Sequence, residues 1–476
     1  MKTIQHILYS CLLVLLAVSC IKDDSIGEVN PVSKIELASK IDTLFTLDRW
    51  ATLQISAPQF TQTNAEKPLS YSWEIDHKEV STEKDLTYVC EKYGVFDGRL
   101  KVSNEDGFFF HYFKVNVRYS YIQGVYALAS HKGKSILSYY PEGIADKTFE
   151  LDTYEKNNPI YKLGTEPKAL FFTNTPIRQE VYIATGNPST LYRLDGNLMM
   201  TTHQMETQGD ITFITHDGAN SVITSAVFLL NKRAGQVESQ KTTFTNFGQQ
   251  SIDGTFGAVE FANRISYWYT SASASANGEL YFDNIGSRMI IRSSNKSSPV
   301  AELFKSEFAG LTLIDVCQAN DKSEFAAVLK NKQSGEFVHY WFNPGYYNQY
   351  NTAKETAPEM KYKGTMPASS GIIETSVIAS APAKNIMYYT NGNKVYAYSI
   401  LSKGNFPTTP LFVCESSGNV ADMFVNKEES KLYVGINDSN PDLPGSIYCF
   451  DINKNTLLWK QTNVTGTIKQ LVYKYP

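Results

Sequence analysis

The chain has 476 residues, of which 19% are charged, and its formal net charge is −4. It therefore lacks the basic field that holds nucleic acid or an acidic membrane surface, and we expect no nucleic-acid partner. Its length allows two or three domains. The 30 Tyr and 26 Phe suit pleated, half-buried surfaces. Composition thus favours an all-β secreted protein.

Residues 1–19 have the pattern of a signal peptide. Lys2 supplies a basic start, an apolar run follows over 7–18, and small residues at 17–19 precede Cys20. The apolar run is shorter than the roughly 20 residues that cross a bilayer. The sequence predicts cleavage before Cys20, which leaves 476 − 19 = 457 residues.

The cysteine that follows the small residues resembles the lipobox of bacterial lipoproteins. That resemblance implies that Cys20 is acylated and anchors the chain; the alternative is an ordinary signal peptide with a chance cysteine. Lys22-Asp23-Asp24 is similar to the export tag of Bacteroidota lipoproteins that are sent to the outer face of the outer membrane. The polar residues up to Asn30-Pro31 make 20–32 a flexible tether between lipid and protein.

Short alternating runs predict a β-sandwich over 33–119. They occupy 52–55, 69–75, 96–102 and 109–117, with turn residues between them, as at Asn104-Glu105-Asp106-Gly107. Alternation interrupted by turns is typical of strands that bury one face in a sandwich core. The alternation also places Trp73 on the inward face.

Part of this segment resembles the PKD (polycystic kidney disease) domain, an immunoglobulin-like sandwich. The residues that carry the resemblance are Tyr71-Ser72-Trp73 on one strand, Leu86-Thr87-Tyr88, and the run from Gly94 to Ser103. Val95-Phe96-Asp97 departs from the family's usual pattern, so we describe the segment as PKD-like.

Residues 120–476 repeat one theme of strand, turn and Tyr-rich strand. The clearest instances pair 180–185 with 190–195, and 431–436 with 446–452. Unit starts 40 to 60 residues apart predict a β-propeller of seven blades, whose ends the run 467–473 would close. Further β-sandwiches are the alternative. The predicted unit starts are Gly124, Lys168, Asp210, Gly257, Leu311, Gly371 and Asn419.

No motif in the sequence indicates catalysis. HExxH, GxSxG and the P-loop are absent from it, and the histidines, among them His216 and His339, have no catalytic spacing. The run 437–442 resembles a calcium loop in composition but lacks the Gly and terminal Glu of an EF-hand, so we interpret it as a polar hairpin loop. We therefore predict neither an enzyme nor a metal or cofactor site. A glycosidase pair of carboxylates is not visible in one sequence.

Four cysteines remain beyond the leader and anchor. They are too few and too widely spaced for a disulfide framework or a CxxC metal site, which favours buried free thiols over bridges. They are Cys90, Cys317, Cys414 and Cys449.

An irregular stretch interrupts the repeat at 343–351 and continues to Pro367. Tyr346, Tyr347 and Tyr350 lie in it among Asn and Gln, and rigid aromatic area with adaptable amides suits a peptide- or polymer-binding face. The alternative is a loop that packs on its own blade. Trp268, between two tyrosines, is a second candidate for ligand binding.

The whole architecture resembles the PKD-like surface lipoproteins of Bacteroidota. The resemblance implies a non-catalytic accessory or ligand-binding subunit beside a SusC-like TonB-dependent transporter and a SusD-like lipoprotein, which import oligopeptides or glycans. It implies a location on the cell surface, anchored in the outer membrane by lipid alone. A surface hydrolase or lyase on a propeller, and an adhesion or structural lipoprotein, are the alternatives.

Overall fold

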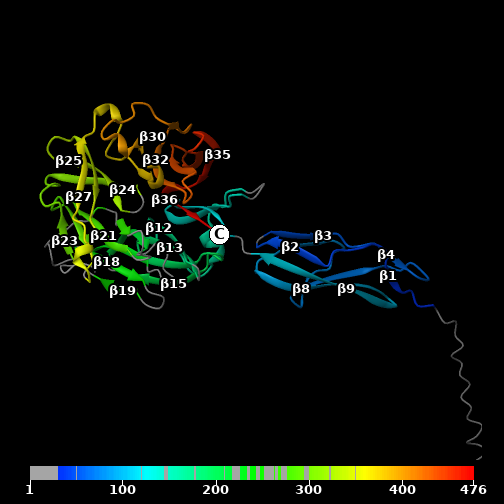
Figure 1. Cartoon of the computed structure of the whole chain (residues 1–476). Helices are drawn as coiled ribbons and strands as arrows, with labels where there is room; N and C mark the ends of the chain where they lie inside the picture. Colours follow the sequence, from blue (N-terminus) through cyan, green and yellow to red (C-terminus); the bar gives the residue numbers. More distant parts are fainter. Residues whose placement is uncertain are drawn as a thin grey trace, which may run out of the picture. The chain divides into compact units, whose positions relative to one another are not determined.

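The computed structural model describes residues 31–475, apart from 50, 119–120, 144–147, 176–177, 208, 217–225, 233–235, 243–246, 251–261, 263–265, 270–275, 294–299, 321–322 and 349. The fold is all-β (Figure 1). The chain divides into two compact units, Met1–Ser120 and Tyr121–Pro476. None of the described helices is long and apolar enough to cross a membrane.

The first unit contains a five-stranded sheet of order β2-β9-β8-β5-β6 and two small pairs, β1-β4 and β3-β7. β2 runs parallel to β9, and the other pairs are antiparallel. The strands are β1 (Ile35–Leu37), β2 (Leu44–Asp48), β3 (Thr52–Ile55), β4 (Phe60–Gln62), β5 (Ser70–Ile75), β6 (Lys78–Ser81), β7 (Leu86–Val89), β8 (Gly94–Asn104) and β9 (Gly107–Arg118).

One core joins the sheets of the first unit. Leu53 of β3 and Leu86 of β7 pack with side chains of β5, β8 and β9. Trp73 is fully buried, as its alternation predicted, and its Nε1 donates to the Glu83 carbonyl at 3.0 Å. Gly98 lies opposite Phe113, whose ring would be 2.2 Å from a Cβ there, so only glycine leaves room for that ring.

In the described part of the second unit, the strands form one three-stranded sheet, β11-β10-β36, and six four-stranded sheets that each follow chain order. The strands of the three-stranded sheet are β10 (Gly124–His131), β11 (Lys134–Tyr140) and β36 (Thr467–Lys474). The others are β12 (Glu166–Thr175), β13 (Arg178–Gly186), β14 (Thr190–Asp195), β15 (Thr201–Glu206), β16 (Gly209–His216), β17 (Ala226–Lys232), β18 (Gln236–Thr242), β19 (Phe247–Gln250), β20 (Ser266–Tyr269), β21 (Ala276–Asp283), β22 (Arg288–Arg292), β23 (Val300–Leu303), β24 (Leu311–Asn320), β25 (Glu324–Asn331), β26 (Phe337–Asn343), β27 (Glu359–Thr365), β28 (Ile378–Ala381), β29 (Ile386–Asn391), β30 (Lys394–Ser399), β31 (Phe412–Val413), β32 (Asn419–Val425), β33 (Lys431–Asn437), β34 (Gly445–Asp451) and β35 (Thr456–Thr465).

Short helical turns lie between some of these strands. They are α2 (Thr153–Asn157), η1 (Thr352–Lys354), η2 (Ala368–Ser370), η3 (Pro382–Lys384) and η4 (Ile400–Ser402).

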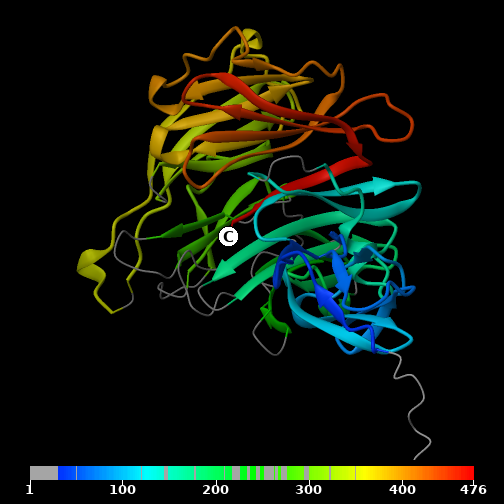
Figure 2. The same cartoon turned by 90° about the vertical axis from the view of Figure 1, so that its right-hand side faces the viewer.

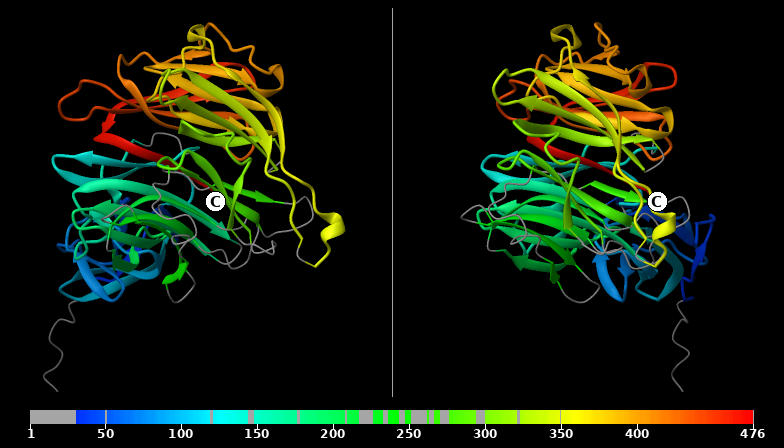
Figure 3. Two further views of the ribbon diagram at one scale, coloured as in Figure 1. Left: turned by 90° about the vertical axis from the view of Figure 1, so that its left-hand side faces the viewer. Right: turned by 60° about the vertical axis from the view of Figure 1, so that its left-hand side comes forward.

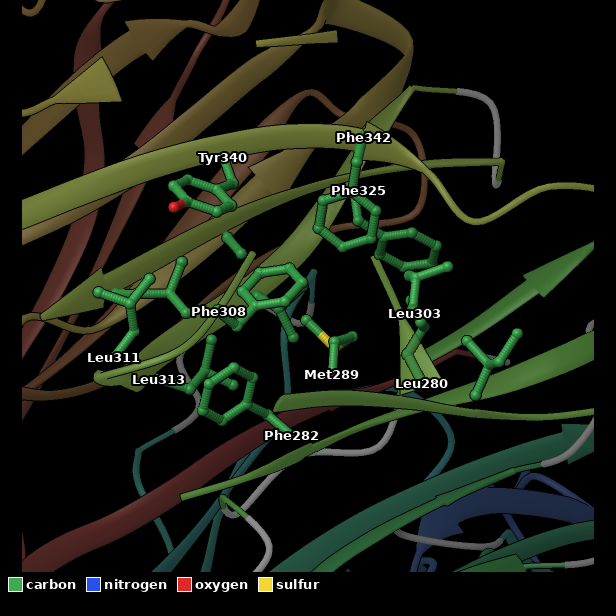
Figure 4. Close-up of a cluster of buried hydrophobic side chains, with 14 of the residues drawn as sticks. Leu280, Phe282, Met289, Leu303, Phe308, Leu311, Leu313, Phe325, Tyr340 and Phe342 are labelled. Atoms are coloured by element: carbon green, nitrogen blue, oxygen red, sulfur yellow. The ribbon is translucent and has the colours of Figure 1, made fainter. Parts of the chain in front are cut away.

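Neighbouring sheets of the second unit pack face to face. The first strands contact each other, β12 with β16, β24 with β28, and β28 with β32. Figure 4 shows one core between two sheets, in which Phe282 and Met289 point toward Phe308 and Phe342. Consecutive four-stranded meanders stacked through their first strands are the arrangement of a β-propeller.

The last strand closes the second unit. β36 pairs antiparallel with β10 (Figure 2), as predicted for 467–473. It is also bonded to both neighbouring sheets, because the Leu170 amide donates to Gln470 Oε1 at 2.8 Å and the Leu471 amide donates to Asp422 Oδ2 at 2.6 Å. The C-terminal strand β36 therefore joins the two ends of this unit.

Lys474, at the end of β36, is fully buried. Its Nζ donates to the Ile122 carbonyl at 2.7 Å, to Gln179 Oε1 at 2.7 Å and to Asn197 Oδ1 at 3.1 Å. Burial lowers the pKa of Lys474 to about 8. Two of these three neutral acceptors, Gln179 and Asn197, thus fix the closing strand to the sheet that follows it around the unit.

Several local predictions are confirmed. The run 180–185 pairs with 190–195 in β13 and β14, and predicted unit starts at Gly124, Leu311 and Asn419 are the first residues of β10, β24 and β32. The unit expected to start at Gly371 begins its sheet only at Ile378, because Gly371, with a φ of 78°, ends η2. Gly257 lies outside the described residues. The four cysteines are free and buried.

His339 is a buried polar residue in an aromatic core. It lies in β26, and its ring centroid is 5.2 Å from Tyr398, 5.6 Å from Tyr362 and 5.8 Å from Phe406. Neither ring nitrogen has a hydrogen-bond partner among the described residues. Burial lowers the pKa of His339 to about 4, so the neutral ring is the folded form.

We expect His339 to make stability depend on pH. The unfolded chain binds a proton below about pH 6.5, whereas the folded chain does not until about pH 4, so about 3 kcal/mol of stability should be lost as pH falls between these values. His339→Phe removes this proton. Urea unfolding of both proteins from pH 7 to pH 4 should therefore show the variant gaining relative to the native chain as pH falls; a constant difference would contradict the assignment.

Candidate functional site

The predicted tyrosine loop is the connection between β26 and β27, which projects beyond its sheet in both views of Figure 3. Its two arms are joined where the Tyr346 and Thr356 amides donate to each other's carbonyl, both at 3.0 Å. A Cβ on Gly345 would lie 2.6 Å from the Thr356 carbonyl, so the arms approach too closely for a side chain there. The two arms thus form a hairpin.

The three tyrosines of this hairpin face different ways. Tyr350 is 89% exposed, and Tyr346 is half-buried, its hydroxyl accepting from Asn348 Nδ2 at 3.2 Å. Tyr347 is only 6% exposed, packs in the core of Figure 4, and donates to the Pro344 carbonyl at 2.9 Å. Burial raises the pKa of Tyr347 to about 12. Tyr347 is therefore a core residue, a correction to its predicted place on a binding face.

The other predicted residues lie partly or wholly outside the described residues. The backbone of Trp268 belongs to β20, and nothing is described of its side chain. Cys20 lies outside the described residues altogether.

A second site, which sequence reasoning missed, surrounds Glu142 just after β11. We call it the Glu142 cluster. It consists of Glu142 and Lys431 with aromatic residues from the first and last sheets of the second unit: Tyr140, Phe149, Phe424, Tyr433, Trp459, Tyr473 and Tyr475.

Glu142 is 8% exposed, and both of its carboxylate oxygens accept hydrogen bonds. Its Oε1 accepts from Lys431 Nζ at 2.9 Å and from Trp459 Nε1 at 3.0 Å, and its Oε2 accepts from the Tyr433 hydroxyl at 2.7 Å. Three donors therefore surround one buried charge, as burial of a carboxylate requires.

The pKa values of the cluster follow from these contacts. Burial raises the pKa of Glu142, but the hydrogen bonds from Tyr433, Trp459 and Lys431 outweigh it, and the pKa is lowered overall. Burial, together with the neighbouring carboxylate, raises the pKa of Tyr433 and Tyr473. Glu142 is therefore an anion, and both tyrosines are neutral.

The aromatic rings form a continuous contact series around the carboxylate. The Tyr433 centroid is 4.7 Å from Phe424, 5.4 Å from Tyr473 and 6.0 Å from Trp459. Trp459 continues the series to Tyr140 at 4.8 Å. Tyr433 is buried, whereas the other six aromatic residues are half-buried.

This arrangement suits binding better than proton transfer. A general acid or base needs a proton-transfer position open to substrate, and the Glu142 oxygens are already occupied by protein donors. The half-buried rings instead offer rigid apolar area beside the Lys431 ammonium, whose side chain is 34% exposed. Such a surface can stack on a planar or apolar ligand face and bond its polar groups.

Other buried carboxylates of the described residues are likewise occupied by cations. Glu324 accepts from Trp341 Nε1 at 2.8 Å and pairs with Lys361 at 2.5 Å. Asp283 pairs with Arg288 at 2.9 Å. No group of three His, Cys, Asp or Glu in the described part of the chain is placed to hold a metal ion.

We expect Glu142→Gln to destabilise the second unit by about 2–4 kcal/mol, because the amide nitrogen would face donors and the Lys431 charge would lose its partner. Urea unfolding measures this change. The control is Glu155→Gln, which removes an exposed pair with Lys162 and should cost less than about 1 kcal/mol. Equal losses in the two variants would show that the Glu142 network adds nothing beyond a surface ion pair.

Comparisons with known proteins show no matching family model and no matching curated protein. Among solved structures, a quinonprotein alcohol dehydrogenase-like protein from Bacteroides thetaiotaomicron is 14% identical, with a TM-score of 0.44, over 93% of this chain and 96% of that chain. The β-propeller domain of Cps50 (Swd1) from Myceliophteria thermophila is 9% identical, with a TM-score of 0.45, over 70% and 98%. The dihydro-heme d1 dehydrogenase NirN is 8% identical, with a TM-score of 0.39, over 73% and 74%. Likenesses at this level assign no activity to the chain.

Proposed function

We propose that this protein is a surface-exposed outer-membrane lipoprotein that acts as a non-catalytic, ligand-binding accessory subunit of a SusC/SusD-like importer of oligopeptides or glycans. The signal-peptide pattern, the lipobox-like cysteine at Cys20 and the run Lys22-Asp23-Asp24, which resembles an export tag, support the location. A flexible tether over 20–32 would hold the folded units near the transporter.

The finer architecture belongs to the same proposal. We interpret the first unit as a PKD-like sandwich, because its sheets share one core around Trp73. We interpret the three-stranded sheet and the six four-stranded sheets as the seven blades of a propeller, closed by β36.

The observation that carries the proposed activity is the Glu142 cluster. Its half-buried rings offer stacking area, and its carboxylate is held by Lys431, Tyr433 and Trp459 rather than left open for chemistry. Sugars and peptides both present apolar faces edged by polar groups, which such a surface can recognise. Tyr346 and Tyr350 on the projecting hairpin are candidates for a second contact.

Membrane anchoring makes weak binding sufficient. A lipid-anchored protein and a transporter in the same membrane meet at an effective concentration far above that of two freely diffusing proteins. An accessory subunit therefore needs only to capture an oligomer briefly and hold it near the channel. A half-open aromatic surface fits this task better than an enclosed pocket, from which release would be slow.

We expect the tagged, lipidated protein to co-purify with a SusC-like barrel and a SusD-like lipoprotein when it is extracted from outer membranes in mild detergent and analysed by mass spectrometry. Cys20→Ala is the control, since a chain without its anchor should leave the membrane fraction and lose these partners. Recovery of the native protein alone, at near-native yield, would contradict the accessory role.

The same preparation tests the ligand site. Trp459→Ala should lower the amount of co-purified oligopeptide or oligosaccharide at least tenfold, because it removes a stacking ring and a donor to Glu142. Tyr161→Ala, which removes a 42% exposed ring outside the cluster, is the matched control. If Trp459→Ala left both the amount of co-purified ligand and the recovery of the partners unchanged, the ligand would bind at a site other than the Glu142 cluster, and the proposed importer association would still stand.

A further inference from the structure

The outer face of the five-stranded sheet in the first unit carries a row of aromatic side chains. β9 alternates, so that Phe109, His111 and Phe113 face the core side while the neighbouring residues point outward. Phe108 is 63% exposed and Tyr112 62% exposed. With the half-buried Phe110 between them, these three rings form what we call the aromatic ladder.

The rings of the aromatic ladder touch in series. Phe108 and Phe110 have centroids 4.9 Å apart, and Phe110 and Tyr112 have centroids 6.1 Å apart. The interplanar angles are 49° and 45°, so the ladder follows the twist of the sheet instead of forming a flat platform.

Polar side chains flank the ladder on the neighbouring strands. The Arg99 guanidinium lies 4.7 Å from the Phe110 centroid, and the Lys101 ammonium lies 5.5 Å from the Phe108 centroid. Arg99 Nη2 donates to both Glu74 oxygens, at 2.5 and 2.7 Å. Further along β5, β6 and β8 lie hydroxyls and a carboxylate that bond one another across the strands, through the pairs Ser70 with Ser103 and Ser72 with Glu79.

We propose that the aromatic ladder is a binding site for a soluble, neutral polysaccharide. Pyranose rings present C–H faces that pack on aromatic rings, and their equatorial hydroxyls would reach the Arg99–Glu74 pair, Lys101 and the serines at the side. The site lies in the first unit, so it is separate from the Glu142 cluster and does not depend on it.

The charge and shape of the ladder select this ligand class. Arg99 and Lys101 are balanced on the same face by Glu74 and Glu79, which gives no net field for an anionic polymer. The tilted rings fit a chain that twists in solution and do not match the flat surface of a crystalline polymer.

A protein partner fits the ladder less well. An aromatic side chain buries about 150–250 Å² when fully covered, so three partly exposed rings offer less than the about 800 Å² per partner of a standard interface. An added peptide strand would bond the part of β9 that precedes Lys114, where β2 does not pair with it, in the plane of the sheet. Because side chains stand perpendicular to a sheet, that strand would leave the outer ring surfaces uncovered.

The test is affinity electrophoresis of the full mature chain in gels that contain barley mixed-linkage β-glucan, arabinoxylan or galactomannan. We expect at least one of these neutral, soluble polymers to retard the native chain, and Phe108→Ala/Tyr112→Ala to weaken that binding at least tenfold. Val95→Ala, which alters a 63% exposed residue elsewhere on the same face, should leave it unchanged.

Four results would overturn the proposal. The first is that none of the three polymers retards the native chain, and the second is that the double variant, shown to be folded by circular dichroism, is retarded as strongly as the native chain. The third is binding only to microcrystalline cellulose or polygalacturonate, and the fourth is a concentration-dependent dimer in light scattering that the double variant does not form. The last would make the ladder an interface between copies of the chain. Because no partner protein is present, each result is independent of the importer association.

Discussion

The pairing of β36 with β10 is the constraint on which the second unit depends. Without it, β10 and β36 would each expose an unpaired strand edge, which invites pairing with other chains. Three sets of contacts hold β36 in place. They are its backbone hydrogen bonds to β10, the side-chain hydrogen bonds to the sheets on either side, and the hydrogen bonds of the buried Lys474 ammonium. The Ser138 and Thr465 hydroxyls, 2.7 Å apart, add a buried bond between the first and last sheets. The ends of the second unit are therefore joined by directional polar contacts in addition to the packing of its apolar core.

The Glu142 cluster is a consequence of that closure. Glu142 follows the second strand of this unit, whereas Lys431, Tyr433 and Trp459 come from its last sheet, 289 to 317 residues further along. The candidate binding surface exists only when the two ends of the unit meet. The buried carboxylate also makes closure selective, since an uncompensated charge would remain if the last sheet failed to dock. Stability and the candidate binding surface thus rest on the same contacts.

Local patterns in the sequence predicted the strands well and the site poorly, for one physical reason. Alternation records which face of a strand is buried, and it placed Trp73 inward and paired β13 with β14 correctly. It says nothing about which distant strands come together, and Glu142 is one of 48 acidic residues with no local signal to distinguish it. In the hairpin after β26, where alternation is absent, neighbouring Tyr346 and Tyr347 could not be told apart, although one is half-buried and the other belongs to the core.

The aromatic ladder shows a further way in which a pattern hides a site. From Phe108 to Phe113 both faces of β9 are aromatic, so the composition alone predicts a strand that is buried on both faces. The neighbouring strand β8 shows which face is exposed. Its Arg99 and Lys101 lie beside the outer rings, while its Leu100 lies beside the inner ones. Exposed rings are tolerated there because cations and hydroxyls surround them and break up the apolar surface. In the Glu142 cluster the arrangement is the opposite, because aromatic rings surround a charged group. In both places aromatic area is combined with polar groups whose charges are already balanced, so a neutral ligand can be bound without leaving a charge unpaired.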